Sequence, residues 1–204
     1  MPAVCAIRTG LVGLLSLIAA PLAQPQQGNC DRACLEGFID QYLDALQRKD
    51  PTRLPWAANA RFTENNVELA VGDGLWGTIT GLGPHRIRVG DVQTGQAGFF
   101  GQVQETRESS AFAVRLKIAD RRIAEAETIV VRLADMGSLG GDRNPFEKAV
   151  FADRPIFQQS LAPSERRPRE RLISVADGYF DTLQLNDGVL FTEFDPACVR
   201  YENG

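Results

Sequence analysis

The sequence predicts an α+β domain in which helices come first and a long, curved antiparallel sheet follows. Residues 31–49 carry an apolar stripe of helical period, and residues 85–132 alternate between apolar and polar side chains with a period of two. Turn-forming residues separate the alternating runs at hairpin spacing, which predicts a meander of neighbouring strands.

The first helix is expected over residues 31–49. Asp31 is a suitable N-cap, Arg48 and Lys49 suit the negative end of the helix dipole, and Pro51 ends the helix. Apolar residues recur three and four positions apart, which defines one buried face. This face carries Leu35, Phe38, Ile39, Tyr42, Leu43 and Leu46.

A mixed segment follows the first helix. We expect a short helix over residues 52–58 and a strand over 61–64 that ends at the turn pair Asn65-Asn66. Gly72-Asp73-Gly74 predicts a tight turn, because glycine tolerates positive φ. A short buried helix is then expected over residues 75–82.

Four alternating strands are expected in the second half of the domain. Gly98 and Gly101 lie inside the second of them, where glycine marks a bulge or a curved sheet. The strands are expected over residues 85–92, 97–106, 111–118 and 123–132.

Residues 1–23 predict a secretory signal, with cleavage near Ala23. The apolar run 11–20 is too short to span a bilayer and ends in small residues. A retained N-terminal anchor is the alternative. We therefore expect an extracellular or periplasmic protein with no membrane contact once the signal is removed. The formal net charge of -4 argues against a nucleic-acid partner.

Three cysteines remain in the mature chain. Cys30 and Cys34 are spaced four apart at the start of the first helix, within reach of a disulfide in an oxidising compartment. Cys198 is then odd, with a partner elsewhere, a free thiol or a missing piece of chain as the alternatives. A single histidine and few cysteines do not make a metal set of recognisable spacing, so no metal and no cofactor are expected.

A second helix, expected over residues 171–186, repeats the first. Residues 175–187 are identical to residues 38–50 at six of thirteen positions, far above chance. Glu64-Asn65 also recurs near the end of the chain, as Glu202-Asn203. The sequence therefore divides into a signal (1–23), an α+β domain (24–135), an arm or linker (136–168) and a partial second repeat (169–204).

The second repeat stops where the first enters its opening strand. A helix and half a strand cannot bury a core. Either the natural chain continues, or this piece completes the first domain. We expect the first of these.

The order of elements, with the motif Gly-Asp-Gly-Leu-Trp-Gly at residues 72–77, resembles the SnoaL-like branch of the nuclear transport factor 2-like superfamily. Residues 31–50, 61–78 and 123–132 resemble, more narrowly, an uncharacterised secreted family with such domains in tandem. The resemblance implies a cone-shaped antiparallel sheet wrapped against the long N-terminal helix. Members of the superfamily act on small molecules inside the cone, bind ligands or form homodimers, so the fold alone does not give the function.

An enzyme on this fold needs an acid or base held in an apolar pocket. His85 and Tyr42 are the first candidates, with Asp44 or Glu127 as the acid. Such an enzyme would be a cofactor-free lyase, isomerase or hydrolase acting on a small apolar molecule.

The alternative is a non-catalytic ligand-binding or interaction module whose cone is filled by its own side chains. Trp76, Phe99 and Phe112 are the residues expected to fill or line it, and Asp73 lies in the adjacent turn. On this alternative Asp73 is present because it suits a turn, and Tyr42 is a structural residue whose buried hydroxyl is hydrogen-bonded. We favour the module.

Overall fold

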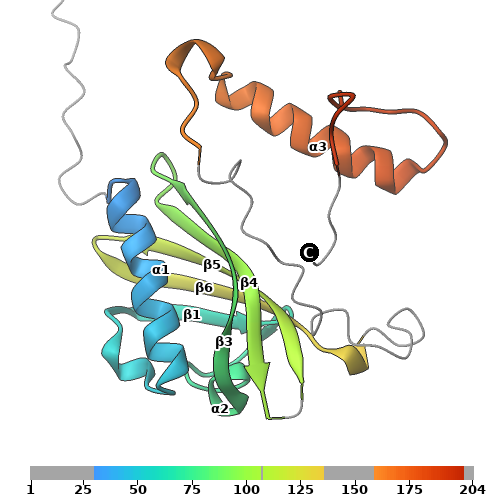
Figure 1. The fold of residues 1–204 in the computed structure, drawn as a ribbon. Coiled ribbons are helices and arrows are strands. Elements are labelled where there is room, and N and C mark those ends of the chain that lie inside the picture. Colours follow the sequence, from blue (N-terminus) through green and yellow to red (C-terminus); the bar gives the residue numbers. More distant parts are fainter. Residues whose placement is uncertain (1–29, 107, 136–158, 200–204) are drawn as a thin grey trace, which may run out of the picture.

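The computed structural model describes residues 30–106, 108–135 and 159–199, and of His85 it describes only the backbone. The expected signal (1–23), most of the expected arm and the recurring Glu202-Asn203 pair lie outside these residues. The protein is a mixed α+β structure in which a helix lies across one face of a curved, unclosed sheet (Figure 1).

Helix α1 (Arg32–Gln47) covers the sheet with the predicted stripe. All six stripe residues are buried, and the helix packs against strands β3, β4 and β5. The Asp31 side chain accepts a hydrogen bond from the Cys34 backbone N–H at 2.8 Å, which confirms the predicted N-cap. The apolar period therefore produces the expected helix and the expected buried face.

A six-stranded sheet forms the second layer, with strand order β2-β1-β6-β5-β4-β3. The predicted four-strand meander is present, and each of its neighbouring pairs is antiparallel. The strands are β1 (Trp56–Glu64), β2 (Val67–Glu68), β3 (Ile79–Asp91), β4 (Gln96–Glu105), β5 (Ser109–Ala119) and β6 (Arg122–Val131).

Strand β1 departs from the expectation of a wholly antiparallel sheet. It pairs with β6 in parallel, with Phe62 opposite Ala126 and Glu64 opposite Thr128. A parallel neighbour requires a long connection, and the meander between β1 and β6 provides one. Alternation along β1 gives no information about direction, so the sequence could not predict it.

Two expected helices are shorter than predicted. Residues 52–58 form only the 3₁₀ turn η1 (Pro51–Arg53), and residues 75–82 form only helix α2 (Leu75–Thr78). Ile79 already pairs with Glu105, so β3 begins six residues before the expected start at His85. The β-branched residues Ile79 and Thr80 favour a strand. Pairing with β4 stabilises these residues more than a longer α2 would.

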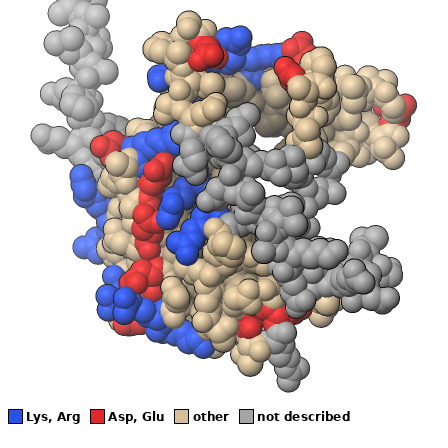
Figure 2. Space-filling model, viewed as in Figure 1, with Lys and Arg blue, Asp and Glu red and all other residues tan. Residues whose placement is uncertain are grey.

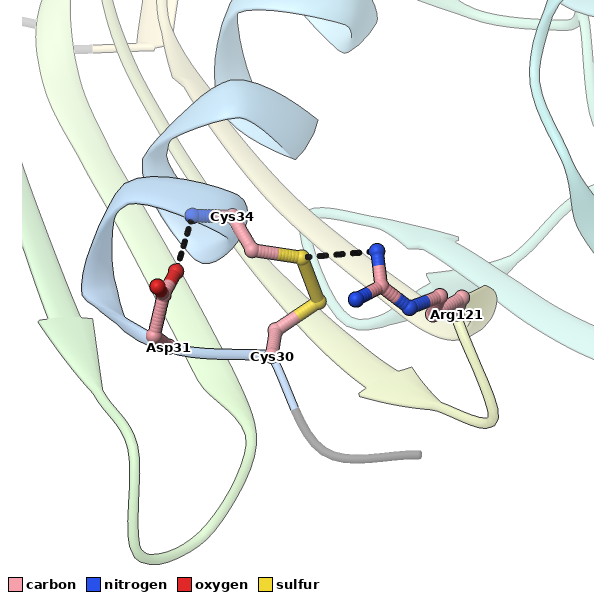
Figure 3. The surroundings of a disulfide bond; sticks show 4 residues. All are labelled: Cys30, Asp31, Cys34 and Arg121. Atoms are coloured by element: carbon pink, nitrogen blue, oxygen red, sulfur yellow. Dashed lines mark hydrogen bonds between the residues drawn. A yellow bond between two sulfur atoms is a disulfide. The ribbon is translucent and has the colours of Figure 1, made fainter. Parts of the chain in front are cut away.

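A disulfide between Cys30 and Cys34 fixes the start of α1, as predicted (Figure 3). The Cα atoms are 5.1 Å apart, and Arg121, in the turn before β6, donates to the Cys34 sulfur at 3.9 Å. Figure 3 shows the capping residue Asp31 beside the same bond. The hydrogen bond from Arg121 thus links the start of the helix to a turn 87 residues further along the chain.

The second helix, α3 (Arg169–Leu185), follows a 3₁₀ turn, η4 (Pro163–Glu165), and confirms the expected helix at nearly its expected bounds. Arg169 forms a bidentate pair with Asp91 at the end of β3, with contacts of 2.9 and 2.6 Å. Figure 1 shows α3 lying apart from the sheet. Cys198 is a free, exposed thiol. No helix among the described residues is long and apolar enough to span a membrane.

Candidate functional site

The Gly-Asp-Gly turn is held by one carboxylate. Glu64, at the end of β1, is buried and accepts a hydrogen bond from the Leu75 backbone N–H at 2.8 Å. Gly74 has φ of +65°, and a Cβ at this position would lie 2.4 Å from Glu64 Oε2. Glycine is therefore required here for its conformation and because the carboxylate occupies the space of a side chain.

The next residue, Asn65, continues the edge of β1. Its side-chain amide donates to the Val130 carbonyl at 3.0 Å and accepts from the Val130 N–H at 2.9 Å, which imitates a backbone pairing. Its own N–H donates to the Thr128 carbonyl. The Glu64-Asn65 pair thus fixes α2 on one side and β6 on the other.

A second polar cluster lies beside this turn, around Glu105 at the end of β4. Arg132 donates to both oxygens of the Glu105 carboxylate, at 2.7 and 3.0 Å. The hydroxyls of Thr78 and Ser110 donate to it at 2.6 and 3.0 Å. Arg132 also lies 3.6 Å from Glu64, so it joins the two carboxylates.

These contacts set the ionisation of Glu105 and Arg132. Burial alone would raise the pKa of Glu105, but hydrogen bonds from Arg132, Thr78 and Ser110 together bring that pKa below its ordinary value. The hydrogen bonds to Glu105 raise the pKa of Arg132 further. A carboxylate with this many donors is a poor general base, so the cluster suits binding and rigidity better than proton transfer.

A cleft of about 390 Å³ opens at this cluster. The Arg132 guanidinium and two carboxylates give it a polar wall, and two threonine hydroxyls add hydrogen-bonding groups. Its lining consists of Thr78, Glu105, Thr106, Glu108 and Arg132. Its size lies at the lower end of small-molecule sites.

The space between α1 and the sheet is occupied by side chains. Trp76, Phe99 and Phe112, the three aromatics expected at the cone, are all buried there. Phe99 and Phe112 pack with ring centroids 6.0 Å apart, and Tyr42 packs edge-on against Trp76 at 5.3 Å. Aromatic packing therefore fills the interior in this region.

Among the described residues, neither the Tyr42 hydroxyl nor the Trp76 indole N–H, both buried in this interior, has a hydrogen-bond partner. Burial raises the pKa of Tyr42 well above its ordinary value, while the indole N–H of Trp76 acts in the opposite direction and the nearby Glu64 adds to the rise. The indole therefore lies close to the hydroxyl without meeting hydrogen-bond geometry. A structural tyrosine was expected to have a hydrogen-bonded hydroxyl, and the part of the chain that the structure describes offers Tyr42 no such partner.

The structure does not bring the acid candidates Asp44 and Glu127 to Tyr42. Asp44 is on the solvent-exposed face of α1, where a hydrogen bond from Arg48 lowers its pKa. Glu127 lies on the outer face of the sheet, and the hydrogen bond from Arg115 lowers its pKa. Asp73 is exposed in its turn. The side chain of His85 lies outside the described residues.

Sequence reasoning missed the cleft. Glu105 is the last residue of β4 and Arg132 directly follows β6, and β5 separates these two strands in the sheet. Their pairing depends on strand order and on the reach of the arginine side chain, and no spacing along the chain signals either. Thr78 reaches the same carboxylate only because α2 ends after four residues.

Charged side chains on the domain surface are mixed in sign. Figure 2 shows Lys and Arg side chains beside Asp and Glu side chains over the α1 side of the domain. Arg115 pairs with Glu125 and Glu127, and Arg88 pairs with Asp40.

Three solved structures illustrate what the chain resembles. A protein from Sphaerobacter thermophilus shares 12% identity (TM-score 0.39), with 47% of this chain and 94% of that chain covered. A de novo designed protein with a curved β-sheet also shares 12% identity (TM-score 0.40; coverage 50% and 88%). A protein of unknown function with a cystatin-like fold, from Methylobium petroleophilum, shares 15% (TM-score 0.41; coverage 69% and 99%). At these TM-scores the likeness carries no functional information.

No curated protein matches the chain significantly. A family model does match, described as a domain of unknown function (DUF8021), over residues 29–149 and 165–204. The matched residues include α1, the whole sheet and α3, and they make up well over half of the sequence. The chain therefore belongs to the DUF8021 family.

Proposed function

We propose that the mature chain is a secreted, non-catalytic, SnoaL-like module that binds a small molecule in the cleft at Arg132. The observation that carries the proposal is the filled interior, where Trp76, Phe99 and Phe112 occupy the space that a catalytic cone would leave open. The order of elements and the helix-on-sheet packing support the SnoaL-like assignment. The disulfide at Cys30 supports an oxidising compartment, and with it secretion.

The filled interior changes the kind of ligand we propose. The sequence predicted a small apolar molecule, as the substrate of the enzyme alternative. The cleft offers instead the Arg132 guanidinium, carboxylate oxygens and threonine hydroxyls, which suit a small polar molecule with both donors and acceptors. The half-buried Glu105 carboxylate holds the guanidinium in place before a ligand arrives, which favours binding by preorganisation.

A fragment screen by NMR on the mature, isotope-labelled chain tests this proposal. Thr106 is exposed in the cleft, so Thr106→Arg should fill it and abolish the shifts that a bound fragment causes. Gln47→Arg is the matched control, because Gln47 is exposed on α1 outside the cleft lining. If fragments still bind to the Thr106→Arg variant, the ligand does not bind in the cleft and the proposal is wrong.

The cofactor-free enzyme remains a second candidate because of one observation, the unpartnered Tyr42 hydroxyl beside Trp76. Buried polar groups without partners are uncommon in folded proteins and often belong to functional sites. Turnover of a small apolar substrate by the mature chain, abolished in Tyr42→Phe, would favour the enzyme over the binding module.

A further inference from the structure

One carboxylate in the lining of the cleft has no cationic partner among the described residues. Glu108 lies in the turn between β4 and β5, where its backbone carbonyl accepts a hydrogen bond from the Glu105 N–H at 2.9 Å. Its side chain is half-buried, and Oε2 accepts a hydrogen bond from the Leu133 backbone N–H at 3.3 Å. These two bonds hold the carboxylate in place, and Oε1 forms no hydrogen bond or ion pair with any described residue.

The guanidinium that shares the cleft does not neutralise Glu108. Arg132 donates to both oxygens of Glu105, at 2.7 and 3.0 Å, and lies 3.6 Å from Glu64. A guanidinium that already faces two carboxylates has no positive charge left to balance a third. Among the described residues, the cleft therefore has an excess of negative charge. This charge acts more strongly in a partly enclosed cleft than on an open surface, because less water screens it.

Building on the proposed binding function of this cleft, we infer that its ligand is a small amine in the cationic form, and that Glu108 selects it. An ammonium group has three N–H donors, so it needs several acceptors. The lining offers two that are unused by the described residues, Glu108 Oε1 and the Thr106 hydroxyl. A hydrogen bond between an ammonium and a carboxylate is roughly twice as strong as one between neutral groups. The small polar ligand is thereby narrowed to a cation.

An anion is the competing ligand, because a guanidinium binds carboxylates and phosphates well. Such a ligand would have to compete with Glu105 for Arg132, and it would approach a cleft that Glu108 also lines. The Arg132–Glu105 pair is bidentate, which is the strongest geometry for this kind of contact. Repulsion and this competition both act against an anion, whereas neither acts against an amine.

Three probes of similar shape test the charge of the ligand: benzylamine, benzyl alcohol and benzoate. Their dissociation constants are measured on the mature, isotope-labelled chain from the NMR shifts of the Thr78 and Thr106 backbone amides. Benzylamine should bind about fivefold more tightly than benzyl alcohol, as expected for one partly exposed ion pair. Benzoate should bind most weakly. Added sodium chloride should reduce the preference for benzylamine, because salt screens the charge of Glu108.

Glu108→Gln tests whether this residue causes the preference. Glutamine keeps an oxygen that can accept from the Leu133 N–H but removes the charge, so the ratio of the benzyl alcohol and benzylamine dissociation constants should fall to about one. Glu68→Gln is the matched control, because it removes an exposed carboxylate outside the cleft lining and should leave the ratio unchanged.

Several outcomes would overturn the inference and leave the binding module standing. They are equal binding of benzylamine and benzyl alcohol, tighter binding of benzoate, and a preference that survives Glu108→Gln. Arg107, the sequence neighbour of Glu108, lies outside the described residues. A preference seen only in Arg107→Gln would mean that this arginine neutralises Glu108, and would equally overturn it. Benzylamine that shifts no cleft amide has the same consequence, and the wider fragment screen with Thr106→Arg then decides the binding module separately.

Discussion

The carboxylate of Glu64 and the backbone N–H of Leu75 are joined by a buried hydrogen bond of 2.8 Å. This contact links the end of β1 to the start of α2 and explains why glycine precedes Leu75. The same two residue types recur in the sequence at Glu202-Asn203, where the sequence predicts part of a second copy of the domain. A fold-determining pair is expected in both copies of a duplicated domain, whereas a catalytic residue need not be.

Replacing Gly74 should destabilise the fold strongly. Gly74→Ala adds a Cβ that would lie 2.4 Å from Glu64 Oε2 at a residue with φ of +65°. We expect a loss of about 2–4 kcal/mol in the free energy of unfolding, from backbone strain and the displaced carboxylate together. Gly77→Ala is the control, since nothing lies within 4 Å of a Cβ there. Urea unfolding of both variants measures the difference, and equal stability would contradict the role of Glu64.

The side chain of Asn65 should stabilise the β1–β6 edge. Asn65→Ala removes both hydrogen bonds to Val130 and should lower the free energy of unfolding by about 1–3 kcal/mol. Asn66→Ala is matched in backbone strain, because both asparagines have positive φ. Asn66 is exposed, so Asn66→Ala should lower the free energy of unfolding only by the smaller amount that comes from placing alanine at a positive φ. Equal losses in thermal unfolding would show that the side-chain bonds contribute nothing.

Removing the Tyr42 hydroxyl should leave stability unchanged or raise it slightly. Tyr42→Phe deletes a buried polar atom without a partner, which by itself opposes folding. Tyr42→Leu keeps the site apolar but removes ring packing against Trp56 and Trp76, and should lower the free energy of unfolding by about 2–4 kcal/mol. A large loss in Tyr42→Phe, measured by denaturant unfolding, would mean that the hydroxyl has a partner in solution.

The contact between α3 and β3 should be lost only in strong acid. The hydrogen bonds from Arg169 and then Thr94 lower the pKa of Asp91 from 3.8 to about 2. A depressed folded pKa stabilises the contact above the unfolded pKa, so this contribution fades as the pH falls from about 4 to about 2. A carboxyl NMR titration of Asp91 should show the low midpoint, and Arg169→Gln should raise it. Arg171→Gln, which removes the Glu193 pair instead, should leave the Asp91 midpoint unchanged.

Much of the fold follows from local patterns in the sequence. The stripe of α1, the N-cap at Asp31, the meander and the Cys30–Cys34 disulfide were each predicted from spacing alone, and the structure confirms them. The parallel pairing of β1 with β6 and the early start of β3 at Ile79 were not predicted. Both depend on pairing with residues distant in the chain, which local propensity does not record.

The candidate site was less predictable than the fold. Trp76, Phe99 and Phe112 were expected at the interior and lie there, but the groups that line the cleft, such as Glu105 and Arg132, carried no sequence signal. Asp44 and Glu127 were chosen as available acids, and each is instead held at the surface by an arginine. Whether a charged residue faces the interior depends on tertiary packing, which composition and spacing do not specify.

The indole resonance of Trp76 tests most directly whether a ligand binds in the cleft at Arg132 and not inside the cone. The chain has two tryptophans, and the Trp56 indole N–H is bound to the Pro51 carbonyl at 2.9 Å, so it serves as an internal reference. When a fragment that binds the chain is added, we predict that the backbone amides of Thr78 and Thr106 shift while the Trp76 indole stays in place. A shift at the Trp76 indole larger than those in the cleft would contradict the account, because it would place the ligand inside the cone.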